Sequence, residues 1–203
     1  MARERTSGRP AVRWVLLLRG VNVGRITVRG AALSACLTGA GFTGVRTVLA
    51  SGNAVVDVAD EAGEAGPAGD DGEGGADGAE VVRARAEAAL RAGFGYEAWV
   101  VAMTPARLAE VADGWPFGHE EGVREHCVLT SDPARLADLH ATAPVGERER
   151  VRLAGDVLYW AVPAGSSTDT PFARALAAAR WKPHVTTRTV RTLRRVLTAA
   201  EAP

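Results

Sequence analysis

Three short polar stretches interrupt apolar runs of the chain, and each carries residue types that bind anions. They are RGVNVGR at residues 19–25, RTVLASGN at 46–53 and TTR at 186–188. Arginine presents a planar fork of donors that matches phosphate oxygens, and hydroxyl and amide groups add further hydrogen bonds. The residue types therefore favour an anionic ligand, either a phosphorylated small molecule or a nucleotide, and they fit nucleic acid less well.

The predicted ligand-binding residues come from all three stretches. Each stretch taken alone is more typical of an ordinary turn or a capped helix, in which the polar side chains satisfy their own backbone. Two polar loops that meet at one end of a sheet are stronger evidence than either alone. The predicted set is Arg19, Asn22, Gly24, Arg46, Thr47, Ser51, Gly52, Asn53, Thr187 and Arg188.

No reaction follows from the residues, so catalytic residues, cofactor and enzymatic status stay open. The first stretch lacks the endings of a Walker loop and the spacing of a dinucleotide fingerprint. A serine hydrolase elbow is missing as well. No metal site is predicted, because the histidines are scattered at positions 119, 126, 140 and 184.

Hydrophobic periodicity predicts the order β-α-β-β-α-β for residues 13–103. Strands are expected at 13–19, 45–49, 54–58 and 96–103. One helix has its apolar face at Leu33, Cys36, Leu37 and Ala40, and the other has Val82, Ala86, Ala89 and Leu90. This is the order of a ferredoxin-like unit, in which the first strand lies beside the third, so the loops around residues 20 and 52 are expected to meet.

The loop at residues 114–122 is the predicted boundary with a second, smaller α+β half. There the pattern indicates β-α-β-β-α and a terminal helix. The fifth element is a helix from Pro171, with Phe172, Leu176 and Ala179 facing inward. Hydroxyls of Thr186 and Thr187 would cap the last helix, from about Arg188, with Arg188, Arg191, Arg194 and Arg195 outward. The expected organisation is a tail at 1–12, a ferredoxin-like subdomain at 13–114 and a second subdomain at 115–203.

Composition bounds the class of protein. The 203 residues are 47% hydrophobic and 24% charged, which is typical of globular proteins. Cys36 and Cys127 are single residues in apolar patterns, so both are predicted to be unpaired core residues. The apolar run WVLLL is too short for a signal peptide or a membrane span, and a cytoplasmic protein without a membrane partner is expected.

Charge is distributed unevenly although the formal net charge is zero. Residues 59–80 hold eight of the 24 acids and no base, which leaves 24 basic against 16 acidic residues elsewhere. Such a basic body favours an alternative function, a non-catalytic module that binds nucleic acid or protein through a basic surface. The acidic stretch at 59–79 cannot bury apolar surface and is predicted to be a flexible insertion.

The chain resembles the bacterial family of domain of unknown function 1697. The family's opening motif is matched by LLLRGVNVGR, and its following strand pair by AGFTGVRTVLASGNAVV. Arg25 departs from the family pattern, which has a second glycine there, and Thr189 and Val190 replace Asn-Trp. The resemblance implies an α+β protein with a ferredoxin-like first half and implies no activity.

Replacement of residues 59–79 by a short Gly/Ser linker is expected to leave the melting temperature nearly unchanged, because the composition of this stretch provides almost no apolar surface to bury. Thermal melts of the two proteins test this. A large fall in the melting temperature would mean that part of the stretch packs against the fold.

Overall fold

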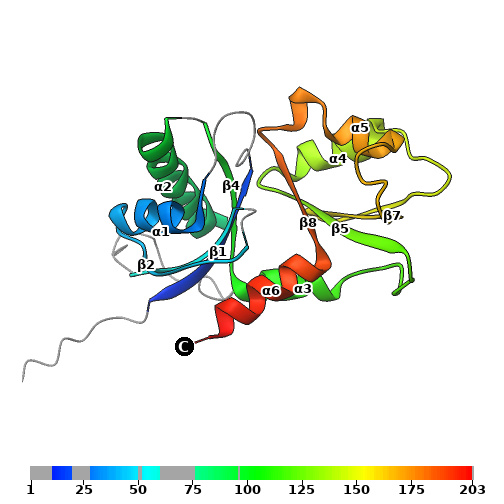
Figure 1. Cartoon of the computed structure of the whole chain (residues 1–203). Helices are drawn as coiled ribbons and strands as arrows, with labels where there is room; N and C mark the ends of the chain where they lie inside the picture. The colour runs from blue at the N-terminus through cyan, green and yellow to red at the C-terminus, as the bar shows by residue number, and fades with distance from the viewer. Residues whose placement is uncertain (1–10, 20–27, 50–51, 60–75, 96, 203) are drawn as a thin grey trace, which may run out of the picture.

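The computed structural model describes residues 11–19, 28–49, 52–59, 76–95 and 97–202. Its first four strands form one antiparallel sheet in the order β2-β3-β1-β4, which confirms the predicted ferredoxin-like unit (Figure 1). The elements are β1 (Val12–Arg19), α1 (Gly30–Gly39), β2 (Thr43–Thr47), β3 (Asn53–Val58), α2 (Ala76–Phe94) and β4 (Trp99–Met103).

Strand β1 is buried on both faces, which explains its uninterrupted apolar sequence. Trp14, Leu16 and Leu18 pack with residues of α1 and α2. Val15 and Leu17 point the other way, into the core between the two sheets. A strand covered on both sides reads as a continuous apolar run, so β1 could be recognised from its sequence.

The second sheet repeats the topology of the first, with the strand order β6-β7-β5-β8. Its elements are β5 (Val123–Thr130), α4 (Pro133–Thr142), β6 (Arg150–Ala154), β7 (Val157–Pro163), α5 (Pro171–Leu176) and β8 (Val185–Thr189). The predicted β-α-β-β-α pattern thus lacked its last strand. We call β1 to α3 the first half and β5 to α6 the second half.

Strand β8 corrects the prediction for the TTR stretch. Thr186, Thr187 and Arg188 were expected at or before a helix start, but they form an antiparallel ladder with β5. Consecutive β-branched residues favour a strand, and β5 would otherwise present an unpaired edge. Helix α6 begins at Val190, and the hydroxyl of Thr189 accepts the backbone N–H of Thr192 as its cap.

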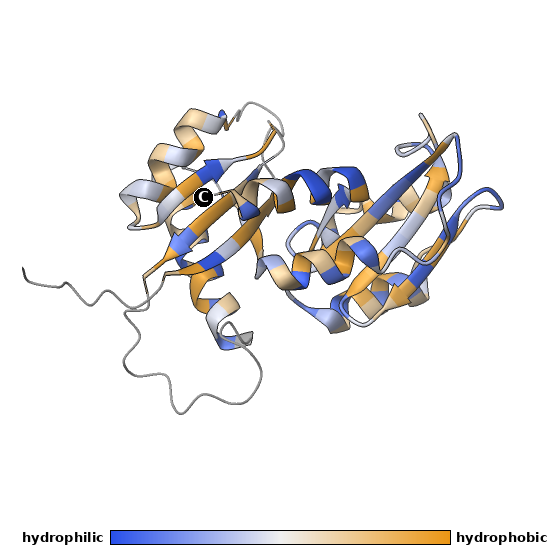
Figure 2. Cartoon of the chain, turned by 90° about the horizontal axis from the view of Figure 1, so that it is seen from below, coloured by the Kyte–Doolittle hydropathy of each residue, from blue (hydrophilic) through white to orange (hydrophobic). Residues whose placement is uncertain are grey.

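Helices α3 (Pro105–Asp113) and α6 (Val190–Glu201) lie together between the two sheets (Figure 1). Helix α3 follows β4 and α6 follows β8, the last strands of their halves. The two halves therefore share this closing helix as well as the order of strands in their sheets. The Thr104 side chain caps α3 by accepting the backbone N–H of Arg107. Hydrophobic residues concentrate on the strands and on the helix sides that pack against them (Figure 2).

Two arginines of the first half hold the carboxyl end of α6. Arg13 donates to the carbonyls of Ala200 and Ala202. Arg46 donates to the carbonyls of Ala199 and Ala202. The last carbonyls of a helix have no partner inside the helix and carry partial negative charge, so cations stabilise them.

Two predicted boundaries differ from the structure. Helix α2 begins at Ala76, so residues 76–79 are helical rather than part of a flexible insertion, and residues 60–75 lie outside the described residues. Because Ala79 packs against the core, the linker replacement is expected to leave the melting temperature unchanged only if it ends at residue 75. Helix α5 ends at Leu176, and Ala179 is exposed at the start of a 3-10 turn (Ala179–Trp181) instead of facing inward. That turn brings Trp181 into the second core, the apolar cluster of the second half that includes Val128, Leu158 and Phe172.

Arg188 joins β8 to the first half. Its guanidinium donates to the carbonyl of Leu18 at 2.7 Å and to that of Gly52 at 3.2 Å. Its Nε donates to Oδ1 of Asn53 at 2.6 Å. Asn53 is fully buried, and its Nδ2 donates to the carbonyl of Val48. Gly52, the residue before it, has a φ angle of +71°, a backbone conformation that favours glycine. Asn53 thus connects the β2–β3 turn to the second sheet.

Asn53→Ala is expected to lower the free energy of unfolding by about 2–3 kcal/mol, because it removes hydrogen bonds from the Arg188 guanidinium and from the carbonyl of Val48. Thr43→Val is the control, since it deletes an exposed hydrogen bond to the carbonyl of Asp57 and should change stability by less than about 0.5 kcal/mol. Urea unfolding of the three proteins measures the difference. Equal effects of the two substitutions would contradict a structural role for Asn53.

Candidate functional site

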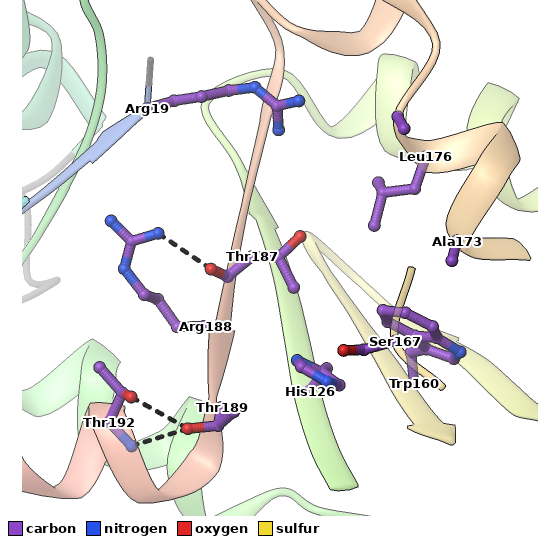
Figure 3. A pocket seen from close by; sticks show the side chains of 11 residues that line it. Arg19, His126, Trp160, Ser167, Ala173, Leu176, Thr187, Arg188, Thr189 and Thr192 are labelled. Atoms are coloured by element: carbon purple, nitrogen blue, oxygen red, sulfur yellow. Dashed lines mark hydrogen bonds between the residues drawn. The ribbon is translucent and has the colours of Figure 1, made fainter. Parts of the chain in front are cut away.

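A cleft of about 450 Å³ opens where the second sheet meets the first half (Figure 3). Strand β8 and the end of β1 form one side, and α5 with the segment before it forms the other. Its lining residues are Arg19, His126, Trp160, Ser167, Ala173, Leu176, Ala177, Thr187, Arg188, Thr189 and Thr192.

The cleft exists because helix α5 is short. In the first half, the corresponding helix α2 has 19 residues and covers its sheet with Val82, Ala86 and Leu90. Helix α5 has six residues, of which Phe172 and Leu176 reach the second core. The sheet face beyond α5, where His126 lies in register with Trp160 and Thr189, is left to line the cleft.

Arg19, the last residue of β1, extends across the cleft mouth (Figure 3). Its Nη1 donates to the carbonyl of Val185 in β8. In the part of the chain that the structure describes, no carboxylate forms an ion pair with Arg19. Burial lowers the pKa of Arg19 because a charged guanidinium is stabilised less away from water.

Arg188 lies on the opposite side of β8 from the Thr187 side chain, with its guanidinium turned toward the first half (Figure 3). Burial and the positive charge of Arg19 lower its pKa to about 10. Two guanidinium groups that repel each other in a partly desolvated place create a local positive potential. An anion bound between or beside them would relieve this repulsion.

His126 is held as a neutral ring within the cleft. It stacks on Trp160 with ring centroids 4.8 Å apart and an interplanar angle of 25°. Both imidazole nitrogens are buried, and neither forms a hydrogen bond with any residue that the structure describes. Burial, with a smaller contribution from the charge of Arg124, lowers the pKa of His126 to about 4.

Hydroxyl groups and the start of α6 complete the polar lining. Thr189 and Thr192 line the cleft at the amino end of α6. Their hydroxyls lie 2.9 Å apart, and Thr189 also accepts the backbone N–H of Thr192. The amino end of a helix carries partial positive charge, so α6 adds positive potential at its own end of the cleft.

The structure brings only some of the predicted site residues together. Arg19, Thr187 and Arg188 line the cleft, and Gly52 and Asn53 contact Arg188 behind it. The other predicted residues divide into two groups. Arg46 and Thr47 are absent from the cleft lining, with Arg46 at the carboxyl end of α6, whereas Asn22, Gly24 and Ser51 lie outside the described residues.

Sequence reasoning did not select several lining residues, notably His126, Trp160 and Thr192. A signal for His126 exists in the alternation of β5, where Cys127 and Leu129 face the central core. His126 and Val128 must then share the opposite face, so a polar ring is placed on an otherwise apolar surface. Nothing in the sequence shows that α5 stops short of it.

We also searched the described residues for a metal site and for a membrane-spanning helix. Within them, no group of three or more His, Cys, Asp or Glu residues is arranged to hold a metal ion. No described helix combines the length and the apolar character needed to cross a bilayer. Cys36 and Cys127 are both free thiols, as predicted.

A family model matches residues 12–68 and 73–159, which is more than half of the chain. The chain belongs to the family described as protein of unknown function (DUF1697). This confirms the resemblance found in the opening motifs. The match includes β1, β3 and most of β5 to β7, so it spans strands of both halves of this DUF1697 protein.

The chain is similar in fold to the solved structure of the conserved bacterial protein SP0830 from Streptococcus pneumoniae. The TM-score is 0.70 at 17% sequence identity, over 94% of this chain and 99% of that one. At this identity the likeness shows the fold alone, and it confirms the α+β class. Among curated proteins, none matches the chain.

Acid is expected to destabilise the protein through His126. Its pKa of about 4 in the folded state lies below the ordinary value of 6.5, so between these values the unfolded chain binds the proton more readily. The stability contribution is complete above pH 6.5 and is lost as the pH falls toward 4. Between pH 7 and pH 4, the free energy of unfolding should fall in both proteins. We expect the fall to be about 1–3 kcal/mol smaller in His126→Phe than in the parent protein.

Urea unfolding at pH 7, 5.5 and 4 measures this difference. His140→Gln serves as the control, because His140 is exposed on α4 and its replacement should preserve the acid sensitivity of the parent protein. An unchanged pH dependence in His126→Phe would show that His126 is not buried in neutral form.

Proposed function

We propose that this protein binds an anionic, phosphate-bearing small molecule in the cleft between β8, α5 and Arg19. The observation that carries the proposal is the position of Arg19, a partly desolvated guanidinium at the cleft mouth whose hydrogen bond goes to a backbone carbonyl. A phosphate group could accept from the remaining donors of this fork.

Three features of the cleft lining favour negative charge. Arg188 lies close enough to Arg19 for the charge of Arg19 to lower its pKa. The amino end of α6 contributes its helix dipole, and Thr187 and Thr192 contribute hydroxyl donors. Electrostatic attraction is stronger in a partly water-excluded cleft than on an open surface. We assign binding, and no reaction, to these residues.

Arg19→Met is expected to weaken binding of pyrophosphate and nucleotides at least tenfold, because it keeps the apolar stem and deletes the donors. Stability should fall by no more than about 1 kcal/mol, since among the residues that the structure describes only the carbonyl of Val185 loses a partner. Isothermal titration calorimetry and thermal melts with and without these anions measure both quantities.

Arg46→Met is the matched control, since Arg46 belongs to the same half but contacts the end of α6 rather than the cleft. It should lower stability by about 1 kcal/mol and leave anion affinity unchanged. Equal anion affinity in the parent protein and Arg19→Met would contradict the proposed site. So would a collapse of the melting temperature in Arg19→Met without any ligand.

The alternative is a nucleic-acid-binding surface, favoured by the exposed Arg191, Arg194 and Arg195 on α6. Such binding depends on total positive charge and weakens steeply with salt. It would survive Arg19→Met and decline in Arg191→Gln/Arg195→Gln, whereas cleft binding shows the reverse. Titration of a labelled oligonucleotide at two salt concentrations separates the two functions.

A further inference from the structure

We propose that the cleft takes a phosphorylated sugar or other polyol, and that the hydroxyl of Ser167 recognises a hydroxyl group of this ligand. The inference rests on the proposed function, because it concerns the same cleft. It adds a ligand class and a specificity-determining residue, and it distinguishes the ligand from a nucleotide and from inorganic phosphate.

Hydroxyl groups are the uncharged polar side chains that the cleft presents to a ligand. Arg19 lies at the mouth and Ser167 lies near His126 at the other end, with Thr187 between them (Figure 3). Ser167 and Thr187 are half-buried, and neither hydroxyl forms a hydrogen bond with a residue that the structure describes. A hydroxyl both donates and accepts, so each of these groups can pair with a hydroxyl of a ligand in either direction.

A turn before α5 holds Ser167 in place. The carbonyl of Ser166 accepts the backbone N–H of Asp169 at 3.3 Å, so Ser167 and Thr168 occupy the middle of the turn. The two nearest hydroxyls are used inside this segment, because Thr168 donates to Oδ1 of Asp169 and Thr170 caps α5. The hydroxyl of Ser167 is left to the cleft. A group that is already positioned loses little freedom on binding, so its hydrogen bond adds specificity.

The side chains of the cleft are poorly suited to a nucleobase. Protein sites recognise bases by hydrogen bonds to their edges and by stacking on open aromatic rings. Among the described residues that line the cleft, there is no Asn, Gln, Asp or Glu to pair with a base edge. Trp160 is 2% exposed, and both ring nitrogens of His126 are buried, so these rings form a closed wall. The uncharged part of the ligand is therefore expected to carry hydroxyls rather than a base.

The size and the apolar wall of the cleft agree with a polyol phosphate. The volume of about 450 Å³ is within the range of small-molecule sites, roughly 300–1,000 Å³, and an inorganic phosphate would occupy only the part near Arg19. Across the cleft, Ala173, Leu176 and Ala177 of the α5 region supply apolar atoms. A sugar carries C–H groups between its hydroxyls, so its carbon skeleton can pack on this wall while its hydroxyls meet Ser167.

Calorimetric titration of the parent protein tests the ligand class without any variant. The probes are inorganic phosphate, glycerol 3-phosphate, ribose 5-phosphate, glucose 6-phosphate and adenosine monophosphate. Propyl phosphate is the matched control for glycerol 3-phosphate, since it has the same carbon chain and lacks the two hydroxyls. We expect at least one polyol phosphate to bind tenfold or more tightly than propyl phosphate. Adenosine monophosphate should bind no more than threefold more tightly than ribose 5-phosphate, because the base gains little in this cleft.

Ser167→Ala tests the recognition residue. It should reduce the advantage of the preferred polyol phosphate over propyl phosphate at least fivefold, and it should change the affinity for propyl phosphate and inorganic phosphate by less than twofold. Ser166→Ala is the matched control, because Ser166 precedes Ser167 in the same segment and is absent from the cleft lining. This control should keep the full advantage. Arg19→Met should weaken binding of every compound.

The outcomes separate this inference from the proposed function. Arg19-dependent binding in which no polyol phosphate exceeds propyl phosphate would overturn the ligand class and leave the anion site standing. Adenosine monophosphate binding tenfold or more tightly than ribose 5-phosphate would do the same, since the base would then be recognised. Full advantage in Ser167→Ala, or an equal loss in Ser166→Ala, would overturn the role of Ser167. Absence of Arg19-dependent binding for every compound would overturn both the inference and the proposed function.

Discussion

The hydrogen bonds of Arg188 fasten the second half of this protein to the first half. A guanidinium taken out of water loses strong hydration, and only well-placed acceptors offset that loss. The ends of β1 and β3 supply them through Leu18, Gly52 and Asn53. Because Arg188 belongs to β8, the same bonds fix the strand that presents Thr187 to the cleft and leads into α6. Arg188 therefore contributes both to the junction and to the site.

The elements of the first half could be predicted well because their patterns are local. The apolar run of β1 and the helical spacing of Leu33 and Leu37 each identify their element directly. The last strand was missed, although its β-branched residues favour a strand. Residues 185–189 contain hydroxyls and an arginine, and what makes them a strand is the open edge of β5, which lies more than fifty residues away. Pairing across such a distance leaves little local trace.

The candidate site was predicted in part for the same reason. Arginine, threonine and glycine near turns indicated an anion, but residue types do not show which arginines meet. Arg46 and Arg188 looked alike in sequence, and the fold sends one to the end of α6 and the other to the junction. His126 entered the site only because α5 is short. Cleft formation beside a short helix is a property of tertiary packing.

The position of α6 has a consequence for how the chain is made. Its residues Val190, Leu193 and Val196 share a core with Val15 and Val55 of the first sheet. The strands of the first sheet emerge from the ribosome long before α6 does. During translation, the face of that sheet on which α6 packs is therefore not yet covered by this helix. The nascent first half must therefore wait in a partly assembled state, which exposes it to chaperones and to aggregation until the last turn of α6 emerges.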